Sequence, residues 1–339
     1  MKKLLGIVLS CIALSILIRP ACPAADGNYA IEVLQVTKIG PYEESFTGFV
    51  GELEKNGLVQ GQNLTINRRI IDFDIEKGGL WKKIGVLMEI KKEASRIVDA
   101  RPDLVLTIGT VSTKHVKDKA INAGIPLVFT GVAIPEAAGC KSLTSAGPGF
   151  TGSTLYMDMS DALKIIRLAL PDIKTMAMIY SDDENAVAHK DQALKAGPST
   201  GFTFLTKEIG KSDPIVPAAQ ELLAQGAQAF VMPLDTYYGL RDYEPQKALV
   251  NFALENKVPV ISLVYHRQHG FVLYVGSAFD IIGAYSAQQA LEILKQGADP
   301  GSLPIRRLEE LNIMVDVKAM KSLGIQLPME ILQLAKSVE

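Results

Sequence analysis

The first half of the chain alternates short apolar runs with longer stretches in which apolar residues recur every three or four positions. The run IEVLQVT (residues 31–37) predicts a strand, and residues 42–56, which are followed by Gly57, predict a helix. The same alternation predicts further strands at 64–72, 103–109 and 125–131 and further helices at 81–100 and 113–123. Repeated strand–helix–strand units indicate a parallel sheet with right-handed crossovers and helices on both faces.

The pattern breaks at SAGPGFTGS (residues 145–153), a stretch rich in glycine and small polar residues, and then starts again. ARPDLVLTIGT before the break corresponds to AQGAQAFVMPLD after it, and INAGIPLVFT corresponds to LENKVPVISL. The second series predicts strands at 175–181, 201–210, 227–235, 258–264 and 271–280, helices at 186–196, 215–225, 245–256 and 281–296, and then a strand and short helices, the last opened by Pro328. We predict an α/β fold of two similar, doubly wound lobes with parallel sheets.

Length and composition fit this organisation. A chain of 339 residues has room for two domains, and its 48% apolar and 21% charged residues are ordinary for globular proteins. The formal net charge of −2 provides no excess of positive charge for binding nucleic acid, so we expect no nucleic-acid partner.

The N-terminal 25 residues have the pattern of a secretory signal peptide. Lys2 and Lys3 precede an apolar run at 4–18, and small residues follow at 21–25. The apolar run is shorter than a comfortable membrane-spanning helix, although an uncleaved N-terminal anchor is the alternative. We therefore predict an exported protein that is periplasmic or extracellular.

The cysteines fit export without requiring a lipid anchor. Cys11 and Cys22 lie in or beside the predicted signal peptide, and Cys140 stands alone in the body of the chain. The string RPAC before residue 23 places arginine and proline where a lipoprotein signal has small apolar residues, and VLSC lies very early. Lipidation at Cys11 or Cys22 is therefore the less favoured alternative, and Cys140 is more typical of a packed residue than of a nucleophile.

An ordered set of segments gives the chain a family resemblance. The segments are GFVGELEKNGLVQGQNLTI, PDLVLTIGTVST, GIPLVFTGVAIPEAAG, GFTGSTLY, VPVISL, YVGSAFDIIG and VDVKAMKSLGIQLPMEIL. With them the chain resembles the extracellular solute-binding proteins of ATP-binding-cassette (ABC) uptake systems, of the type I periplasmic-binding-protein fold, and among these the subgroup with tryptophan-binding lipoprotein relatives. The resemblance implies a monomeric receptor without enzymatic activity that hands a small solute, such as an aromatic or branched amino acid, to a membrane ABC permease.

The resemblance also implies how the chain is divided. Three crossings between the lobes are expected near 149–153, 276–280 and 307–312. The first lobe then comprises residues 28–150 plus 280–308, and the second comprises 152–276 plus 311–339. Three connecting strands form a hinge that can bend while keeping the lobes in register, as closure around a ligand requires.

Candidate ligand contacts in the first lobe lie where its parallel strands end, because loops and helix N-termini converge there. These positions hold Thr37, Tyr42, Thr110, Ser112, Thr130 and Gly131. Hydroxyl groups beside the free N–H groups of the next helix suit a carboxylate without any lysine or arginine. The alternative is that Ser112 or Thr113 only caps its own helix.

The corresponding positions of the second lobe hold Tyr180, Asp235, Thr236 and Tyr265. Asp235 follows an apolar strand and suits an ammonium group, although a helix N-cap is the alternative. Tyr42, Tyr180, Tyr237 and Tyr265 are candidates for the aromatic walls of a site, and each one alone is also compatible with ordinary packing. After VPVIS the chain reads LVYHRQHG, where its relatives have small and acidic residues, so the ligand identity of the subgroup does not transfer.

Other chemistry finds little support. His266 and His269 are three residues apart but have no evident third metal ligand, and the first strand is not followed by the Gly-x-Gly-x-x-Gly of a dinucleotide site. We therefore predict no metal and no cofactor. A passive solute receptor is the leading hypothesis, and an exported ligand-sensing module that signals to a membrane protein is the alternative. An exported α/β enzyme is disfavoured because no histidine accompanies the hydroxyls and Asp235.

Overall fold

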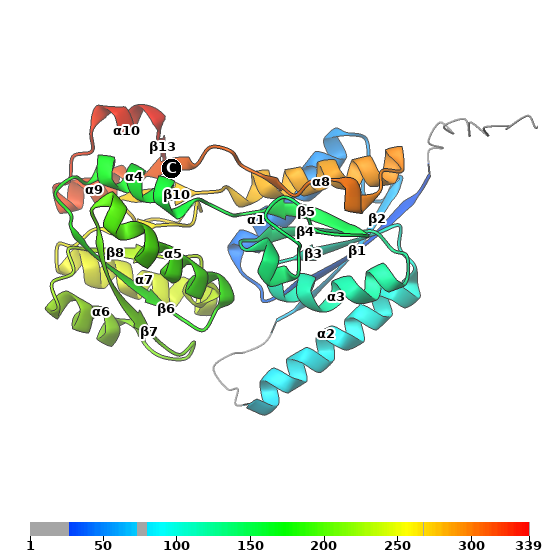
Figure 1. The fold of residues 1–339 in the computed structure, drawn as a ribbon, viewed down its shortest axis with the longest axis horizontal. Helices are drawn as coiled ribbons and strands as arrows, with labels where there is room; N and C mark the ends of the chain where they lie inside the picture. The colour runs from blue at the N-terminus through cyan, green and yellow to red at the C-terminus, as the bar shows by residue number, and fades with distance from the viewer. Residues whose placement is uncertain (1–26, 73–79, 267, 339) are drawn as a thin grey trace, which may run out of the picture.

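The computed structural model describes residues 27–72, 80–266 and 268–338, and they form two α/β lobes side by side (Figure 1). The predicted signal peptide at residues 1–25 lies outside the described residues. None of the helices in the described ranges has the length and apolar character needed to cross a membrane.

The first lobe is built on a six-stranded parallel sheet with the order β11-β5-β4-β3-β1-β2. Its strands are β1 (Tyr29–Val36), β2 (Leu64–Ile71), β3 (Leu104–Ile108), β4 (Leu127–Val132), β5 (Phe150–Thr154) and β11 (Arg306–Arg307). Its helices are α1 (Gly40–Lys55), α2 (Leu80–Ala100), α3 (Thr110–Asn122), η2 (Pro135–Ala138), α8 (Phe279–Gln296) and η4 (Pro300–Ser302). Every residue of β3, β4 and β5 is buried, as expected for strands that are covered by helices on both faces.

The second lobe has a seven-stranded sheet with the order β13-β12-β10-β9-β8-β6-β7. Its strands are β6 (Thr175–Tyr180), β7 (Thr203–Glu208), β8 (Ala229–Met232), β9 (Val260–Ser262), β10 (Leu273–Gly276), β12 (Asn312–Val315) and β13 (Lys336–Ser337). Its helices are α4 (Met159–Ala169), α5 (Glu184–Thr200), α6 (Ile215–Ala224), η3 (Thr236–Gly239), α7 (Leu240–Glu255), α9 (Val317–Leu323) and α10 (Met329–Leu334). The sheet is mostly parallel, but β12 runs antiparallel to β10.

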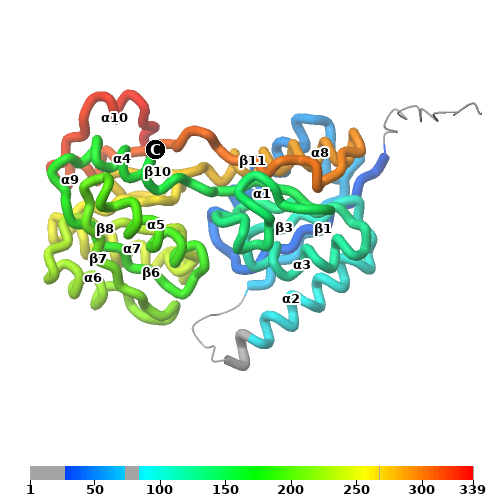
Figure 2. The backbone as a smooth tube through the Cα atoms, in the orientation of Figure 1, coloured from blue at the N-terminus to red at the C-terminus, as the bar shows by residue number. Residues whose placement is uncertain are grey.

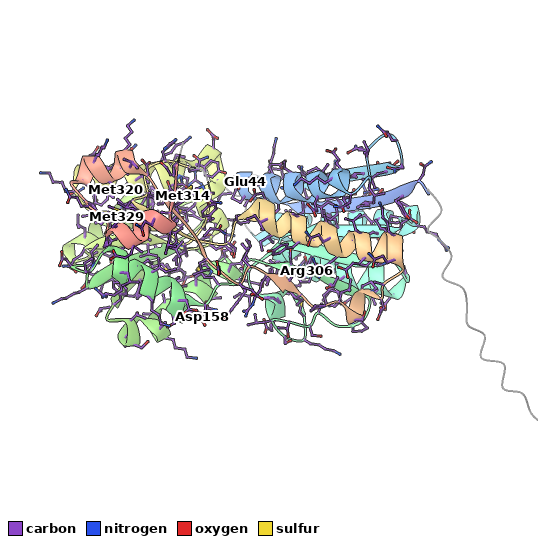
Figure 3. All side chains as sticks on the ribbon, turned by 90° about the horizontal axis from the view of Figure 1, so that it is seen from above. Glu44, Asp158, Arg306, Met314, Met320 and Met329 are labelled. Carbon is purple, nitrogen blue, oxygen red and sulfur yellow. The ribbon has the colours of Figure 1, made fainter. Side chains whose placement is uncertain are left out.

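The chain passes between the two sheets after β5, after β10 and after β11 (Figure 2). The first crossing is later than the predicted 149–153, because β5 pairs with β4 up to Thr154. After the second crossing α8 lies beside α1 in the first lobe, as the view from above shows (Figure 3). The two helices approach closely at Gly48 and Gly283, where a Cβ atom would collide with the backbone of Asp280 and Ser45 respectively.

Helix α3 begins earlier than the sequence pattern predicts, at Thr110 instead of residue 113. Gly109 makes this early start possible, because its φ of 91° turns the chain directly from β3 into the helix. Thr110 and Ser112 therefore belong to the first helical turn and not to a loop before it.

Candidate ligand-binding site

A pocket lies between the two lobes, at the carboxyl ends of strands from both sheets. The empty space between its lining residues is about 510 Å³ when the part open to solvent is included. The first lobe lines it with Ile39, Pro41, Tyr42, Gly131 and Phe279. The second lobe lines it with Asn185, the segment 232–236, Tyr238, Gly239, Tyr243, Gln246, Val264 and His266.

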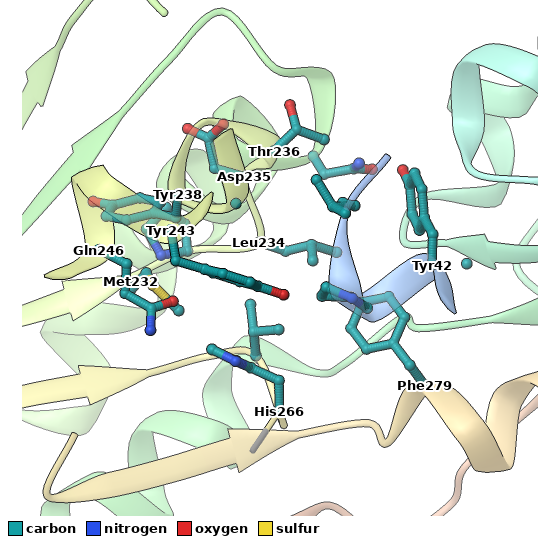
Figure 4. Close-up of a pocket in the computed structure, with 17 residues that line it drawn as sticks. Tyr42, Met232, Leu234, Asp235, Thr236, Tyr238, Tyr243, Gln246, His266 and Phe279 are labelled. Atoms are coloured by element: carbon teal, nitrogen blue, oxygen red, sulfur yellow. The ribbon is translucent and has the colours of Figure 1, made fainter. Parts of the chain in front are cut away.

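Aromatic rings from both lobes form part of the walls of this pocket, together with aliphatic side chains. The ring of Tyr243 extends across its middle, Tyr42 and Phe279 lie on the side of the first lobe, and His266 lies at the end opposite Asp235 (Figure 4). The His266 and Tyr243 rings are nearly parallel, with an interplanar angle of 9° and centroids 6.2 Å apart. Such walls suit a ligand with a flat apolar part.

The lobes touch each other beside the pocket, so the structure is a closed form. The Tyr243 hydroxyl lies against the backbone of Gly40 in the other lobe. Further contacts across the cleft are Thr110 Oγ1 to Asn185 Oδ1 at 3.5 Å and Lys114 Nζ to Glu184 Oε1 at 3.0 Å.

Among the first-lobe candidates, the hydroxyls that follow β3 do not line the pocket. The Ser112 hydroxyl lies 2.6 Å from the carbonyl oxygen of Ile108 and 3.0 Å from that of Gly109, so it is used inside its own helix. The Ser112 hydroxyl is therefore not a helix cap, because it does not accept a hydrogen bond from a helix N–H. It is also not free to contact a ligand. Thr110 lies just outside the pocket, in the contact with Asn185.

Tyr42 and Gly131 do line the pocket, and they lie against each other. The Tyr42 hydroxyl also covers Gly109, where a Cβ atom would come within 2.6 Å of its oxygen. Burial raises the pKa of Tyr42 well above its ordinary value, so the phenol stays protonated.

Thr37 and Thr130 are buried but are not part of the lining. Thr37 has a φ of 74° at the end of β1, and its carbonyl accepts a hydrogen bond from the side chain of Gln35. The Thr130 hydroxyl has no hydrogen-bond partner within the part of the chain that the structure describes.

Asp235 lines the pocket and also caps η3. Its carboxylate accepts hydrogen bonds from the Ser181 N–H at 2.7 Å, the Ser181 hydroxyl at 2.8 Å and the Tyr237 N–H at 2.9 Å. Burial, together with the nearby charge of Asp183, raises the pKa of Asp235 to about 6. Asp235 is therefore the N-cap of η3, as the alternative predicted, and it also holds the ends of β6 and β8 together at the edge of the pocket.

Of the other second-lobe candidates, only Thr236 lines the pocket. Thr236 lines the pocket, with its hydroxyl donating to Asp183 Oδ2 at 2.7 Å. Tyr180 is not in the lining and lies instead under the Lys190 ammonium, 5.6 Å from its ring centroid. Tyr265 is also not in the lining, and Tyr237 is buried with its hydroxyl bonded to the Asp213 carbonyl at 2.7 Å.

Sequence reasoning missed several residues that line the pocket. They are Asn185, Tyr238, Tyr243, Gln246, His266 and Phe279. The sequence predicted Tyr265, but its neighbour His266 lines the pocket. Side chains alternate between two sides in extended backbone, so only one of these two adjacent residues can face the pocket. Tyr243 is reached through three successive left-handed residues, Arg241 to Tyr243, which no simple sequence pattern predicts.

His266 is a neutral base inside the pocket. Burial lowers its pKa to about 4, and its Nδ1 has no hydrogen-bond partner among the described residues. His269, which the sequence paired with it, turns instead towards Asp316, with Nδ1 3.3 Å from Oδ2. Within the described ranges no group of three or more histidine, cysteine, aspartate or glutamate side chains is arranged to hold a metal ion.

Comparisons with known proteins agree with the two-lobed fold. A curated relative, the tyrosine-binding protein of Clostridioides difficile (strain R20291), is 23% identical over 96% of this chain and 93% of its own length. A Streptococcus pneumoniae ABC domain in complex with L-Trp has a TM-score of 0.77 at 18% identity, covering 92% of this chain and 100% of the other. A ligand-free, open substrate-binding protein with adhesive properties from Clostridium difficile has a TM-score of 0.70 at 23% identity, covering 92% and 99%.

The family comparison is the most direct. The model for ABC transporter substrate-binding proteins matches residues 82–339, which is most of the chain and includes every segment of the second lobe. The same range contains the strand ends that line the pocket, apart from those after β1. The chain therefore belongs to the family of ABC transporter substrate-binding proteins.

Proposed function

We propose that this substrate-binding protein captures an amino acid with an aromatic side chain between its lobes and delivers it to an ABC permease. The observation that carries the proposal is the pocket between the lobes, whose apolar part is formed by rings from both sides, Tyr42, Phe279 and Tyr243. The names of two relatives, one tyrosine-binding and one bound to L-Trp, support the same class of ligand.

The polar end of the pocket suits the head group of an amino acid. Asp235 and Thr236 lie together there, and the charge of Asp235 favours an ammonium group. The N-terminus of α3 is not part of the pocket lining and lies beside it, at the contact between Thr110 and Asn185. Ser112 is hydrogen-bonded within its own helix, and we infer that it does not touch the ligand.

Location and assembly follow from the same proposal. Substrate-binding proteins of ABC transporters work outside the cytoplasm, and we infer that the N-terminal 25 residues direct export as a signal peptide. We further infer that the protein acts as a monomer, because two lobes of one chain already enclose the pocket. Closure on a ligand, without turnover, is then the whole of its chemistry.

Ligand-dependent thermal unfolding tests the proposal. The mature protein is unfolded and refolded to remove any carried ligand, and its melting is followed with a panel of amino acids, nucleosides and small organic acids. A ligand at about 100 times its dissociation constant stabilises the native state by about 2.7 kcal/mol, and we expect this for aromatic amino acids. The substitution Tyr243→Ala should abolish the shift, whereas Tyr180→Ala, outside the pocket, should keep it. An unchanged melting temperature with every amino acid would overturn the proposal.

A further inference from the structure

Two polar side chains, His266 and Gln246, lie together at one end of the pocket. His266 and Gln246 both line the pocket, and each has only 3% of its surface exposed. His266 Nδ1 is buried and has no hydrogen-bond partner among the described residues, and the Gln246 side chain shares this end of the pocket with it. Buried polar groups are nearly always paired, and an unpaired one weakens the folded state. A ligand that fills the pocket is the natural partner for both.

The surroundings of His266 fix its ring in place. Phe271 and Tyr274 meet it edge to face, with centroid distances of 5.9 Å and 6.2 Å, and Tyr243 is parallel to it. The imidazole therefore has a defined orientation before any ligand arrives. A neutral imidazole has one donor and one acceptor nitrogen, and an amide side chain can serve as either, so together they suit a group that both donates and accepts.

The position of this pair relative to the rest of the pocket defines what it can recognise. His266 and Gln246 lie away from Asp235 and Thr236, with the Tyr243 ring in between (Figure 4). The pocket is thus polar at both ends and aromatic in the middle. An aromatic amino acid with a hydrogen-bonding group at the far end of its ring has the same order of properties along its length.

Resting on the proposed function, we infer that His266 and Gln246 determine specificity by hydrogen-bonding the distal polar group of the ligand's ring, a phenol hydroxyl above all. A phenol hydroxyl donates and accepts, so it satisfies both side chains. An indole N–H only donates and satisfies one of them, and a phenyl ring leaves both unpaired. Affinity should therefore fall from L-tyrosine to L-tryptophan to L-phenylalanine.

Titration calorimetry with these three amino acids tests the inference on refolded, ligand-stripped protein. We expect L-tyrosine to bind at least about tenfold more tightly than L-phenylalanine, because sites built around a hydroxyl reject the analogue that lacks it. His266→Phe keeps an aromatic ring but removes both nitrogens. The affinities for L-tyrosine and L-phenylalanine should then differ by no more than about threefold. Gln246→Leu should lower the ratio independently. L-Phenylalanine itself reports whether each variant has kept its pocket.

The matched control is His269→Phe, which changes an exposed histidine three residues away and should keep the wild-type ratio. Equal affinity of the wild type for L-tyrosine and L-phenylalanine would overturn the inference, and so would an unchanged ratio in both His266→Phe and Gln246→Leu. In either case the proposed function would stand. If none of the three amino acids binds the wild type, the proposed function fails and the inference fails with it.

Discussion

The two lobes share one architecture but contribute unequally to the pocket. In the first lobe β3 passes directly through Gly109 into α3, so the hydroxyl of Ser112 turns back onto its own helix. In the second lobe β8 is followed by η3 and a left-handed turn before the regular part of α7 begins. That longer connection carries Asp235, Tyr238 and Tyr243 into the pocket. Equivalent strand ends therefore acquire different roles from the segments that follow them.

The largest expected effect is the difference in stability between the variants Asp235→Ala and Ser112→Ala. Asp235→Ala leaves the N–H groups of Ser181 and Tyr237 without their acceptor, so we expect it to lower the free energy of unfolding by about 2–4 kcal/mol and to abolish ligand binding. Ser112→Ala removes only a hydrogen bond within one helix turn and should cost less than about 1 kcal/mol. Urea unfolding and calorimetry of both variants measure the difference.

Asp235→Asn is the control for charge, because it keeps one acceptor oxygen for these donors. Its stability should lie between that of the wild type and that of Asp235→Ala. If Ser112→Ala destabilises the protein as much as Asp235→Ala does, the unequal roles of the two strand ends would be refuted.

A second prediction concerns acid stability in the second lobe. His189 is buried and its Nδ1 accepts the Leu234 N–H at 3.2 Å, and burial lowers its pKa from 6.5 to about 4. Below pH 6.5 the unfolded chain binds a proton at His189, but the folded protein does not until the pH reaches about 4. The stability that neutral His189 contributes is therefore fully present above pH 6.5 and is lost as the pH falls through about 4. The total loss amounts to about 3 kcal/mol.

His189→Gln keeps an acceptor for the Leu234 N–H but cannot be protonated. We therefore expect its free energy of unfolding to approach and then exceed that of the wild type as pH falls from 7 to 4, as measured by urea titrations at each pH. Asp235, whose raised pKa has the opposite sign, is present in both proteins and does not affect their difference. Parallel pH profiles for the two proteins would show that His189 carries no acid sensitivity.

The fold could be predicted because it depends on patterns that repeat. Apolar runs such as those of β3 and β4 become strands buried on both faces, and the echo between the halves predicts a second lobe of the same kind. The antiparallel β12 could not be predicted, because the direction of a strand after a crossing depends on where the chain enters the sheet.

The site was predicted less completely than the fold. Strand ends led to Tyr42, Gly131, Asp235 and Thr236, which do line the pocket. Gln246 belongs to a helix, and its place in the pocket depends on how α7 packs. The role of Tyr243 depends on a backbone conformation that its own sequence does not favour, with φ 62°.

The left-handed turn itself leads to a smaller predicted effect. Asp242 has a φ of 54°, which is unfavourable for a residue with a Cβ, so Asp242→Gly should stabilise the protein by about 0.5–1 kcal/mol. Its exposed contact with Lys247 contributes little to stability. Asp191→Gly, in the regular helix α5, is the control and should destabilise by a similar amount. Both values come from urea unfolding, and loss of stability in both variants would contradict the proposed strain.

The smallest effect concerns the ion pair that joins the lobes. Lys114 on α3 and Glu184 on α5 are about half exposed, so the pair should contribute less than about 1 kcal/mol to closure. Because the contact exists only when the lobes are closed, Lys114→Ala should weaken ligand affinity up to about fivefold without changing the stability of the separate lobes. The loss should shrink as salt is raised from 0.05 to 0.5 M, since exposed ion pairs are screened. Lys164→Ala removes a pair of comparable exposure within the second lobe, with Asp161, and should leave affinity unchanged at every salt concentration. If both variants bind ligand as the wild type does at low salt, closure depends on the aromatic contacts around Tyr243 and Gly40 and not on charge.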